Sequence, residues 1–122
     1  MSNQERFKKE FDQLRRILES YASGLSCEKD ESGDYYLNTT HIMKNKKPLF
    51  FGVVQIKKNY VSYHLMPVYV YPELLESISA ELKRRMQGKS CFNFTSVDSE
   101  LFVELAALTK TGYEKFRSAG YA

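Results

Sequence analysis

The chain has no tryptophan, little cysteine and no long apolar run. Its 122 residues include two cysteines, three prolines and six glycines. Cys27 and Cys91 lie far apart without a CxxC spacing, which predicts free thiols in a reducing compartment. No stretch approaches the roughly 20 apolar residues of a membrane-spanning helix, and the charged start MSNQERFKKEF is unlike a signal peptide. We therefore expect a cytoplasmic protein with no membrane partner.

The composition is that of one folded domain spanning residues 1–122. Nine tyrosines and eight phenylalanines can fill a compact core, and a chain of this length typically buries about two-thirds of the surface that its unfolded form exposes. The net charge is +3, and lysine and arginine are concentrated between residues 40 and 95. These cations can keep strand edges and a helix end soluble, or they can attract a phosphate-bearing or acidic partner.

The stretch KPLFFGVVQIKKNYVSYHLMP, residues 47–67, predicts a β-hairpin. Its arms, 49–56 and 60–66, are rich in β-branched and aromatic residues and flank the polar turn KKN. Both alternating faces of the first arm are apolar, which is typical of a central strand. The second arm alternates an apolar face with a semi-polar face that carries Ser62 and His64.

The elements on the N-terminal side of this hairpin follow from periodicity and charge. Apolar residues at three- and four-residue steps predict an amphipathic helix that begins near Phe7 and stops at Gly24. The charged CEKDESGD that follows is typical of an exposed loop. Residues 35–42 are strand formers, although neither alternating face is cleanly apolar.

On the C-terminal side, Pro72 favours a helix start, with a break near Ser77 or Ser79 and a stop at Gly88. Residues 91–94 predict a short strand, and Asp98 is typical of the N-cap of a last helix. The VYVY run before Pro72 fits either a longer sheet or an irregular apolar connection. The order α-β-β-β-α-β-α predicts an α+β fold with an antiparallel sheet of about four strands and flanking helices.

Three stretches, KPLFFGVVQIKKNYVSYHLMP, PELLESISAELKRRM and QGKSCFNF, occur in this order before an acidic helix start. Together they resemble the YdhG-like domains, a bacterial family of largely unknown function, over roughly residues 35–117. Because some relatives have been proposed as frataxin-like iron chaperones, the resemblance implies that role as an alternative function. Carboxylates suit a hard ion, and the acidic residues that could supply them are Glu28, Asp30, Glu31 and Asp34.

Other chemical motifs are sparse. The histidines and cysteines lack the HxxxH, HxH and CxxC spacings of metal sites, so we expect no metal or other cofactor. Cys91 and His64 are the only candidate nucleophile–base pair, and no third member can be named, so no catalytic residue is assigned. The aromatic residues mostly fall on core stripes without an RNA-binding or recognition-helix signature, so we expect no nucleic-acid partner.

The semi-polar sheet face is the predicted site of function. Hydroxyl, amide and imidazole groups on a sheet must bond to water, to a ligand, to another chain or to covering helices. We expect noncatalytic binding of a small ligand or a protein partner there, with a small enzyme using Cys91 and His64 as a further alternative. An exposed VYVY segment could also support a homodimer. The predicted binding residues are Tyr36, Asn38, Thr40, Ser62, His64 and Asn93, with Lys89 at the rim.

Overall fold

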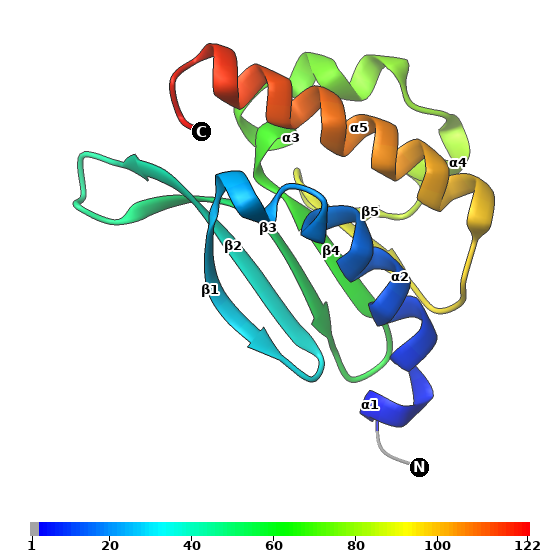
Figure 1. Cartoon of the computed structure of the whole chain (residues 1–122). Coiled ribbons are helices and arrows are strands. Elements are labelled where there is room, and N and C mark those ends of the chain that lie inside the picture. Colours follow the sequence, from blue (N-terminus) through cyan, green and yellow to red (C-terminus); the bar gives the residue numbers. More distant parts are fainter. Residues whose placement is uncertain (1–2) are drawn as a thin grey trace.

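The computed structural model describes residues 3–122, which form an α+β fold on one antiparallel sheet of order β1-β2-β3-β4-β6-β5 (Figure 1). The strands are β1 (Ser26–Glu31), β2 (Asp34–Ile42), β3 (Pro48–Ile56), β4 (Val61–Leu65), β5 (Met86–Gln87) and β6 (Cys91–Phe94). The helices are α1 (Asn3–Arg6), α2 (Lys8–Glu19), α3 (Met66–Val70), α4 (Ala80–Lys83) and α5 (Ser99–Ser118), with 3-10 turns η1 (Ala22–Gly24) and η2 (Pro72–Ser77). The predicted α+β class is therefore confirmed.

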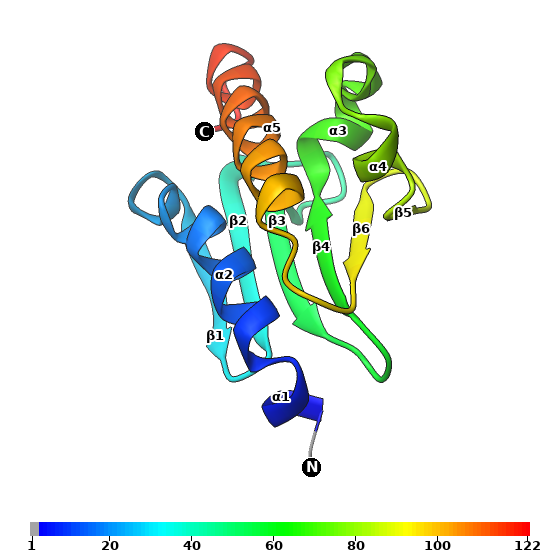
Figure 2. The same cartoon turned by 90° about the vertical axis from the view of Figure 1, so that its right-hand side faces the viewer.

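The helices lie on one face of the sheet. Figure 2 shows α2 and α5 side by side in front of the central strands, with α3 and α4 beside them. The core between the two layers includes Phe51, Tyr63 and Phe116, none of which is measurably exposed. No helix within residues 3–122 lies across the opposite sheet face. We call that surface the open face.

The predicted hairpin is confirmed as β3 and β4, and β3 is a central strand between β2 and β4. A bulge modifies its alternation. Leu37 pairs with Gly52 and Asn38 pairs with Phe50, which leaves Phe51 as an extra residue on β3. Because of this bulge, Phe51 and Gly52 both face the helix layer, whereas Phe50 lies on the open face. Apolar residues on both faces of β3 therefore do not mean that helices cover both sides of it.

The prediction of about four strands is wrong because it missed both edges of the sheet. The segment read as a loop forms β1, whose six residues are all exposed. An edge strand pairs on one side only, and charged side chains protect its free edge from other chains. The other edge, β5, has only two residues and pairs with β6. Neither strand carries the alternation of a half-buried strand.

The connection between β4 and β6 also departs from the sequence prediction. The VYVY run belongs mostly to helix α3 rather than to a strand or an irregular segment. The predicted break is confirmed, because η2 ends at Ser77 and Ser79 caps α4 by accepting a hydrogen bond from the Leu82 N–H at 3.2 Å. Gly88 does not end a helix. It lies between β5 and β6 with a φ of 78°, a conformation that favours glycine.

A second irregularity bends the β2–β3 hairpin. Between the pairs Asn38–Phe50 and Ile42–Pro48, β2 has more residues than β3. The buried Thr39 side chain bonds to the backbone there: its hydroxyl donates to the Leu49 carbonyl at 2.6 Å and accepts from the His41 N–H at 3.2 Å. Thr39 therefore replaces backbone bonds that the bulge removes from the ladder.

Thr39→Val should lower the free energy of unfolding by about 1–3 kcal/mol, because valine keeps the shape but leaves a buried carbonyl and an N–H without a partner. Chemical denaturation followed by circular dichroism measures this loss. Thr40→Val is the matched control, since Thr40 is exposed and its replacement should change stability by less than about 0.5 kcal/mol. Equal losses in the two variants would show that the Thr39 hydrogen bonds contribute nothing.

Candidate functional site

The strand register brings polar side chains into two neighbouring rows on the open face. One row runs through Tyr36, Val53, His64 and Cys91, because each of these residues pairs with the next across adjacent strands. The other row runs through Asp34, Gln55, Ser62 and Asn93. Directly paired residues of antiparallel strands point to the same side, so both rows face away from the helices.

His64 is the central titratable group of this face. Its Nε2 lies 2.5 Å from the Ser90 hydroxyl oxygen, and its ring meets the edge of the Phe50 ring with centroids 4.7 Å apart. Burial lowers the pKa of His64 below the ordinary 6.5, and the nearby Lys57 ammonium lowers the pKa further. The imidazole is therefore neutral at pH 7 and can both donate and accept a hydrogen bond.

This lowered pKa predicts a pH dependence of stability. The unfolded chain binds a proton at His64 near pH 6.5, whereas the folded chain does so only at lower pH. The free energy of unfolding should therefore fall as the pH decreases from about 6.5 through the folded pKa of His64. Urea unfolding at a series of pH values should show this component in the wild type and lack it in His64→Gln.

The titration itself is measured by NMR of the imidazole protons. The chain has two histidines, so His41→Gln leaves one signal and assigns it to His64. A midpoint at or above 6.5 would contradict the buried, Lys57-facing environment of His64.

A cavity of about 200 Å³ lies on the open face beside His64. It is lined by Val53, Gln55, Lys57, Tyr60, Ser62, His64, Gln87, Cys91 and Asn93. Two of its amides are held in place, because Asn93 Nδ2 donates to Gln87 Oε1 at 3.1 Å and Gln55 Nε2 donates to Asp34 Oδ1 at 3.2 Å. The lining contains one ammonium group and no carboxylate. Its chemistry therefore fits a polar ligand with an acidic group.

Most of the residues predicted from the sequence are brought together. Tyr36, Asn38, Ser62, His64 and Asn93 share the open face, and the last three line the cavity. The other two do not line it: the Tyr36 ring packs at a tilt against Phe50 with centroids 5.9 Å apart, and Asn38 Nδ2 donates to Glu28 Oε2 at 3.4 Å.

Thr40 and Lys89 are not part of this cavity. Thr40 is exposed near the end of β2, beyond the point where the Asn38–Phe50 pairing ends. Lys89 lines a separate, largely apolar cavity of about 420 Å³ with Val68, Tyr69 and Met86. Its binding role stays a prediction, since Lys89 lines this second cavity together with Gly88 and not the His64 cavity.

Sequence reasoning missed Ser90, Phe50 and Lys57. Ser90 precedes the predicted strand and carries no periodic signal, so only the β4–β6 register reveals its contact with His64. Phe50 belongs to a strand with apolar residues on both faces, so the side of the sheet on which Phe50 lies depends on the position of the bulge. The place of Lys57 in the site could have been predicted, because Lys57 directly follows strand β3, which pairs with Ser62 and His64.

His64 lies beside Cys91 but is hydrogen-bonded to a different side chain. The two residues are cross-strand neighbours, but His64 Nε2 bonds to the Ser90 hydroxyl. Ser90 is 6% exposed and does not line the cavity, so a substrate in the cavity would meet His64 and Cys91 before the serine. The hydrogen bond to the Ser90 hydroxyl therefore orients the imidazole.

Two of the acidic residues that the iron-chaperone role would require form salt bridges with different basic residues. Asp30 pairs with Arg15 Nη2 at 2.7 Å, and Asp34 pairs with Lys29 at 3.5 Å. Within residues 3–122, no three histidine, cysteine, aspartate or glutamate side chains gather closely enough to hold a metal ion. Asp30 and Asp34 therefore act here as salt-bridge partners.

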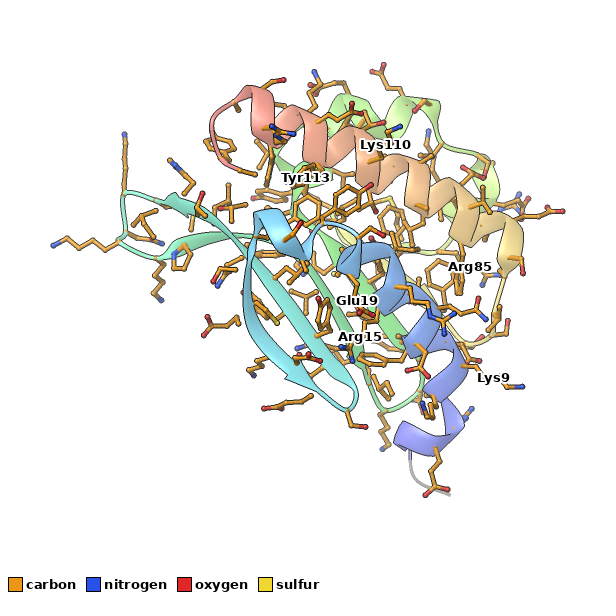
Figure 3. The ribbon with its side chains drawn as sticks, in the orientation of Figure 1. Lys9, Arg15, Glu19, Arg85, Lys110 and Tyr113 are labelled. Carbon is orange, nitrogen blue, oxygen red and sulfur yellow. The ribbon has the colours of Figure 1, made fainter. Side chains whose placement is uncertain are left out.

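Another cavity, of about 530 Å³, lies between α2 and the β1–β2 turn. Figure 3 shows Arg15 and Glu19 on α2, extending toward these strands. Arg15 pairs with Glu19 at 3.2 Å and with Asp30 at 2.7 Å, and its guanidinium lies 4.7 Å from the centre of the Tyr35 ring. These contacts attach the helix to the edge of the sheet, so we assign this cavity a structural role.

Searches against family models, curated proteins and solved structures found no match to this chain. The resemblance of residues 35–117 to the YdhG-like domains therefore stays a prediction. Every helix within residues 3–122 is too short or too polar to cross a lipid bilayer.

Proposed function

We propose that this chain is a noncatalytic binding domain that holds a small polar ligand with an acidic group in the His64 cavity. The observation that carries this proposal is the lining, which combines one ammonium group with hydroxyl, amide and imidazole groups and has no carboxylate. An acidic ligand would pair with Lys57, while the neutral His64 and the amides would bond to its other polar atoms.

The contacts of the cavity support binding to a preformed site. The hydrogen bond between Ser90 and His64 and the one from Asn93 to Gln87 hold these side chains before a ligand arrives. Less conformational freedom is then lost on binding, which favours affinity. The Phe50 ring covers one side of the imidazole and reduces its contact with water. A small ligand would therefore meet ordered groups rather than free side chains.

The proposal is tested by NMR titration of the labelled protein with inorganic phosphate, citrate and glutamate as probes. At least one probe should shift the backbone amides of Ser62, His64 and Asn93 in a saturable way. Lys57→Gln should weaken this binding about tenfold or more, since it removes a charge-assisted contact. Lys58→Gln is the matched control, because Lys58 is the exposed neighbour in the same turn and does not line the cavity.

Two outcomes would overturn the proposal. Shifts confined to other parts of the chain would remove the site assignment, and equal weakening by Lys57→Gln and Lys58→Gln would reduce the contact to unspecific charge attraction. Concentration-dependent shifts of the same amides without any probe would instead indicate that the open face binds a second copy of the chain. Sedimentation velocity distinguishes this homodimer from ligand binding.

The alternative functions have different signatures. Iron uptake that is lost when Glu28, Asp30, Glu31 and Asp34 are all replaced by amides would favour the frataxin-like role. Turnover that requires both Cys91 and His64 would favour a small enzyme. Membership of the YdhG-like family is also a proposal, and it is supported by the three quoted stretches, which form the hairpin, the segment from Pro72 and strand β6 in the same order.

A further inference from the structure

The end of the β2–β3 hairpin projects beyond the rest of the molecule. Figure 1 shows this connection, in cyan to green, extending away from the helices. We call residues 39–49 the basic arm. It carries three exposed lysines, Lys44, Lys46 and Lys47, and an exposed Ile42. The arm lies outside the His64 cavity, and none of these residues lines that cavity.

The tip of the basic arm is a defined turn. The Met43 N–H donates to the Lys47 carbonyl at 2.9 Å, and the Lys46 N–H donates to the Met43 carbonyl at 2.9 Å. The Asn45 side chain accepts from the Lys47 N–H at 3.0 Å, and Lys46 adopts a φ of 68°. These bonds fix the backbone from which the three lysine side chains extend.

The base of the arm is held as well. Thr39 bonds both strands across the bulge, and the His41 ring packs against Tyr121 with centroids 4.6 Å apart. The arm is therefore attached to the sheet on one side and to the chain following α5 on the other. Its direction is set by buried contacts rather than by the turn alone.

The charge of the arm has one sign. No aspartate or glutamate occurs between Asp34 and Glu73, so the chain offers the arm lysines no acidic neighbour in this stretch. No ion pair within residues 3–122 involves the three arm lysines. Ile42, with 57% of its surface exposed, adds an apolar group directly before the turn.

From this geometry we infer that the basic arm enters the major groove of double-stranded DNA. That groove admits a two-stranded β-ribbon, and its phosphates lie on both sides where lysines at the tip can reach them. Ile42 can contact the thymine methyl groups of the groove. The major groove of duplex RNA is too deep and narrow for side chains to read, so DNA fits better.

The distribution of residues on the arm distinguishes this inference from membrane binding. A loop that inserts into lipid carries apolar residues at its end and basic residues behind them. Here the order is reversed, because Lys44, Asn45, Lys46 and Lys47 form the end and Ile42 lies behind them. The inference differs from the sequence-based expectation of no nucleic-acid partner, since the sequence pattern places these lysines in a simple loop between strands.

The test is fluorescence anisotropy of a labelled DNA duplex over a salt series. With three phosphate contacts, the logarithm of the association constant should fall with the logarithm of salt concentration with a slope of about −2.7. Affinity should then weaken about 40-fold between about 50 and about 200 mM salt. Lys44→Ala/Lys46→Ala/Lys47→Ala should reduce the slope by about 1 for each lysine removed.

The matched control is Lys9→Ala/Lys58→Ala/Lys110→Ala, which removes the same charge from exposed positions. Figure 3 shows Lys9 on α2 and Lys110 on α5, away from the arm. This variant should keep the wild-type slope and most of the affinity. Ile42→Ser should weaken binding several-fold without changing the slope, because it removes an apolar contact and no charge.

Three results would overturn the inference: no salt-dependent binding, equal losses in the arm and control variants, or tighter binding to duplex RNA than to DNA. Anionic phosphatidylserine vesicles are tested in parallel by flotation. Binding to vesicles but not to DNA would assign the arm to a membrane surface instead and would also overturn the inference.

Circular dichroism confirms that each variant is folded. If the arm does not bind DNA, the proposal for the His64 cavity and its ligand titration are unaffected, because the arm and the cavity share no residue.

Discussion

Replacing Phe51 with alanine is expected to lower the free energy of unfolding by about 3–5 kcal/mol. Phe51 is fully buried where the helix layer meets the central strand. Its ring packs against Tyr21, Tyr113 and Phe116, with centroid distances of 5.9, 5.6 and 6.1 Å. Truncation removes the contacts between β3 and the segments around α2 and α5 at the same time, and it leaves a cavity that the surrounding rings cannot readily fill.

The matched control for Phe51 is its neighbour Phe50. The bulge places Phe50 on the open face, where it is half-buried against His64 and Tyr36. Phe50→Ala should therefore cost less than half as much stability as Phe51→Ala, and it should move the pKa of His64 back toward 6.5 because the imidazole becomes more hydrated. Chemical denaturation measures both variants. A larger loss for Phe50→Ala would mean that the bulge has been placed on the wrong residue.

Gly112→Leu is expected to have the second-largest effect, a loss of about 2–3 kcal/mol. Gly112 is buried within α5 and faces Pro67 of α3. A Cβ atom there would lie 2.7 Å from Pro67 Cβ and 3.0 Å from Pro67 Cγ. Because the proline ring is rigid, α3 and α5 must move apart. Leucine favours a helix over glycine by less than about 1 kcal/mol, which offsets only part of this cost.

The control on the same helix is Lys110→Leu, because Lys110 is exposed. It introduces the same side chain without a clash, so stability should change by less than about 0.5 kcal/mol. Thermal unfolding followed by circular dichroism measures both variants. If Gly112→Leu proved as stable as Lys110→Leu, the close contact between Gly112 and Pro67 would be refuted.

Elements with a strong local signal could be predicted from the sequence. The β3–β4 hairpin has dense β-branched residues, and Asp98 caps α5 by accepting a hydrogen bond from the Leu101 N–H at 3.1 Å. Strand β1 could not be recognised from its sequence, because all of its residues are exposed and none of them marks a buried face. Its pairing with β2 is what defines it as a strand. Helix α3 was missed because valine and tyrosine favour strands, and here packing on α5 outweighs that preference.

The site could be predicted only in part for a similar reason. Alternation places Ser62 and His64 on one face, and the β4–β6 register then adds Asn93 to that face. The partner of the imidazole could not be predicted, because Ser90 lies outside the alternating part of its strand and reaches His64 only when β6 pairs with β4. The cavity that Lys89 lines could not be predicted, because the residue follows a turn at Gly88, whose φ of 78° the sequence does not specify.

The pairing of β4 with β6 has a consequence for the order of folding. The β3–β4 hairpin joins residues close in the chain, whereas His64 and Ser90 are separated by 26 positions. Contacts of long sequence separation form late because a large loop must close first. The hairpin can therefore form early, while the His64 cavity is completed only when β6 joins the sheet. Solvent protection of the Leu65 amide, which donates to the Ser90 carbonyl at 2.9 Å, should therefore appear later than that of the Lys57 amide, which donates to the Tyr60 carbonyl within the hairpin at 2.8 Å, so the contact between β4 and the β6 segment reports that the sheet is complete.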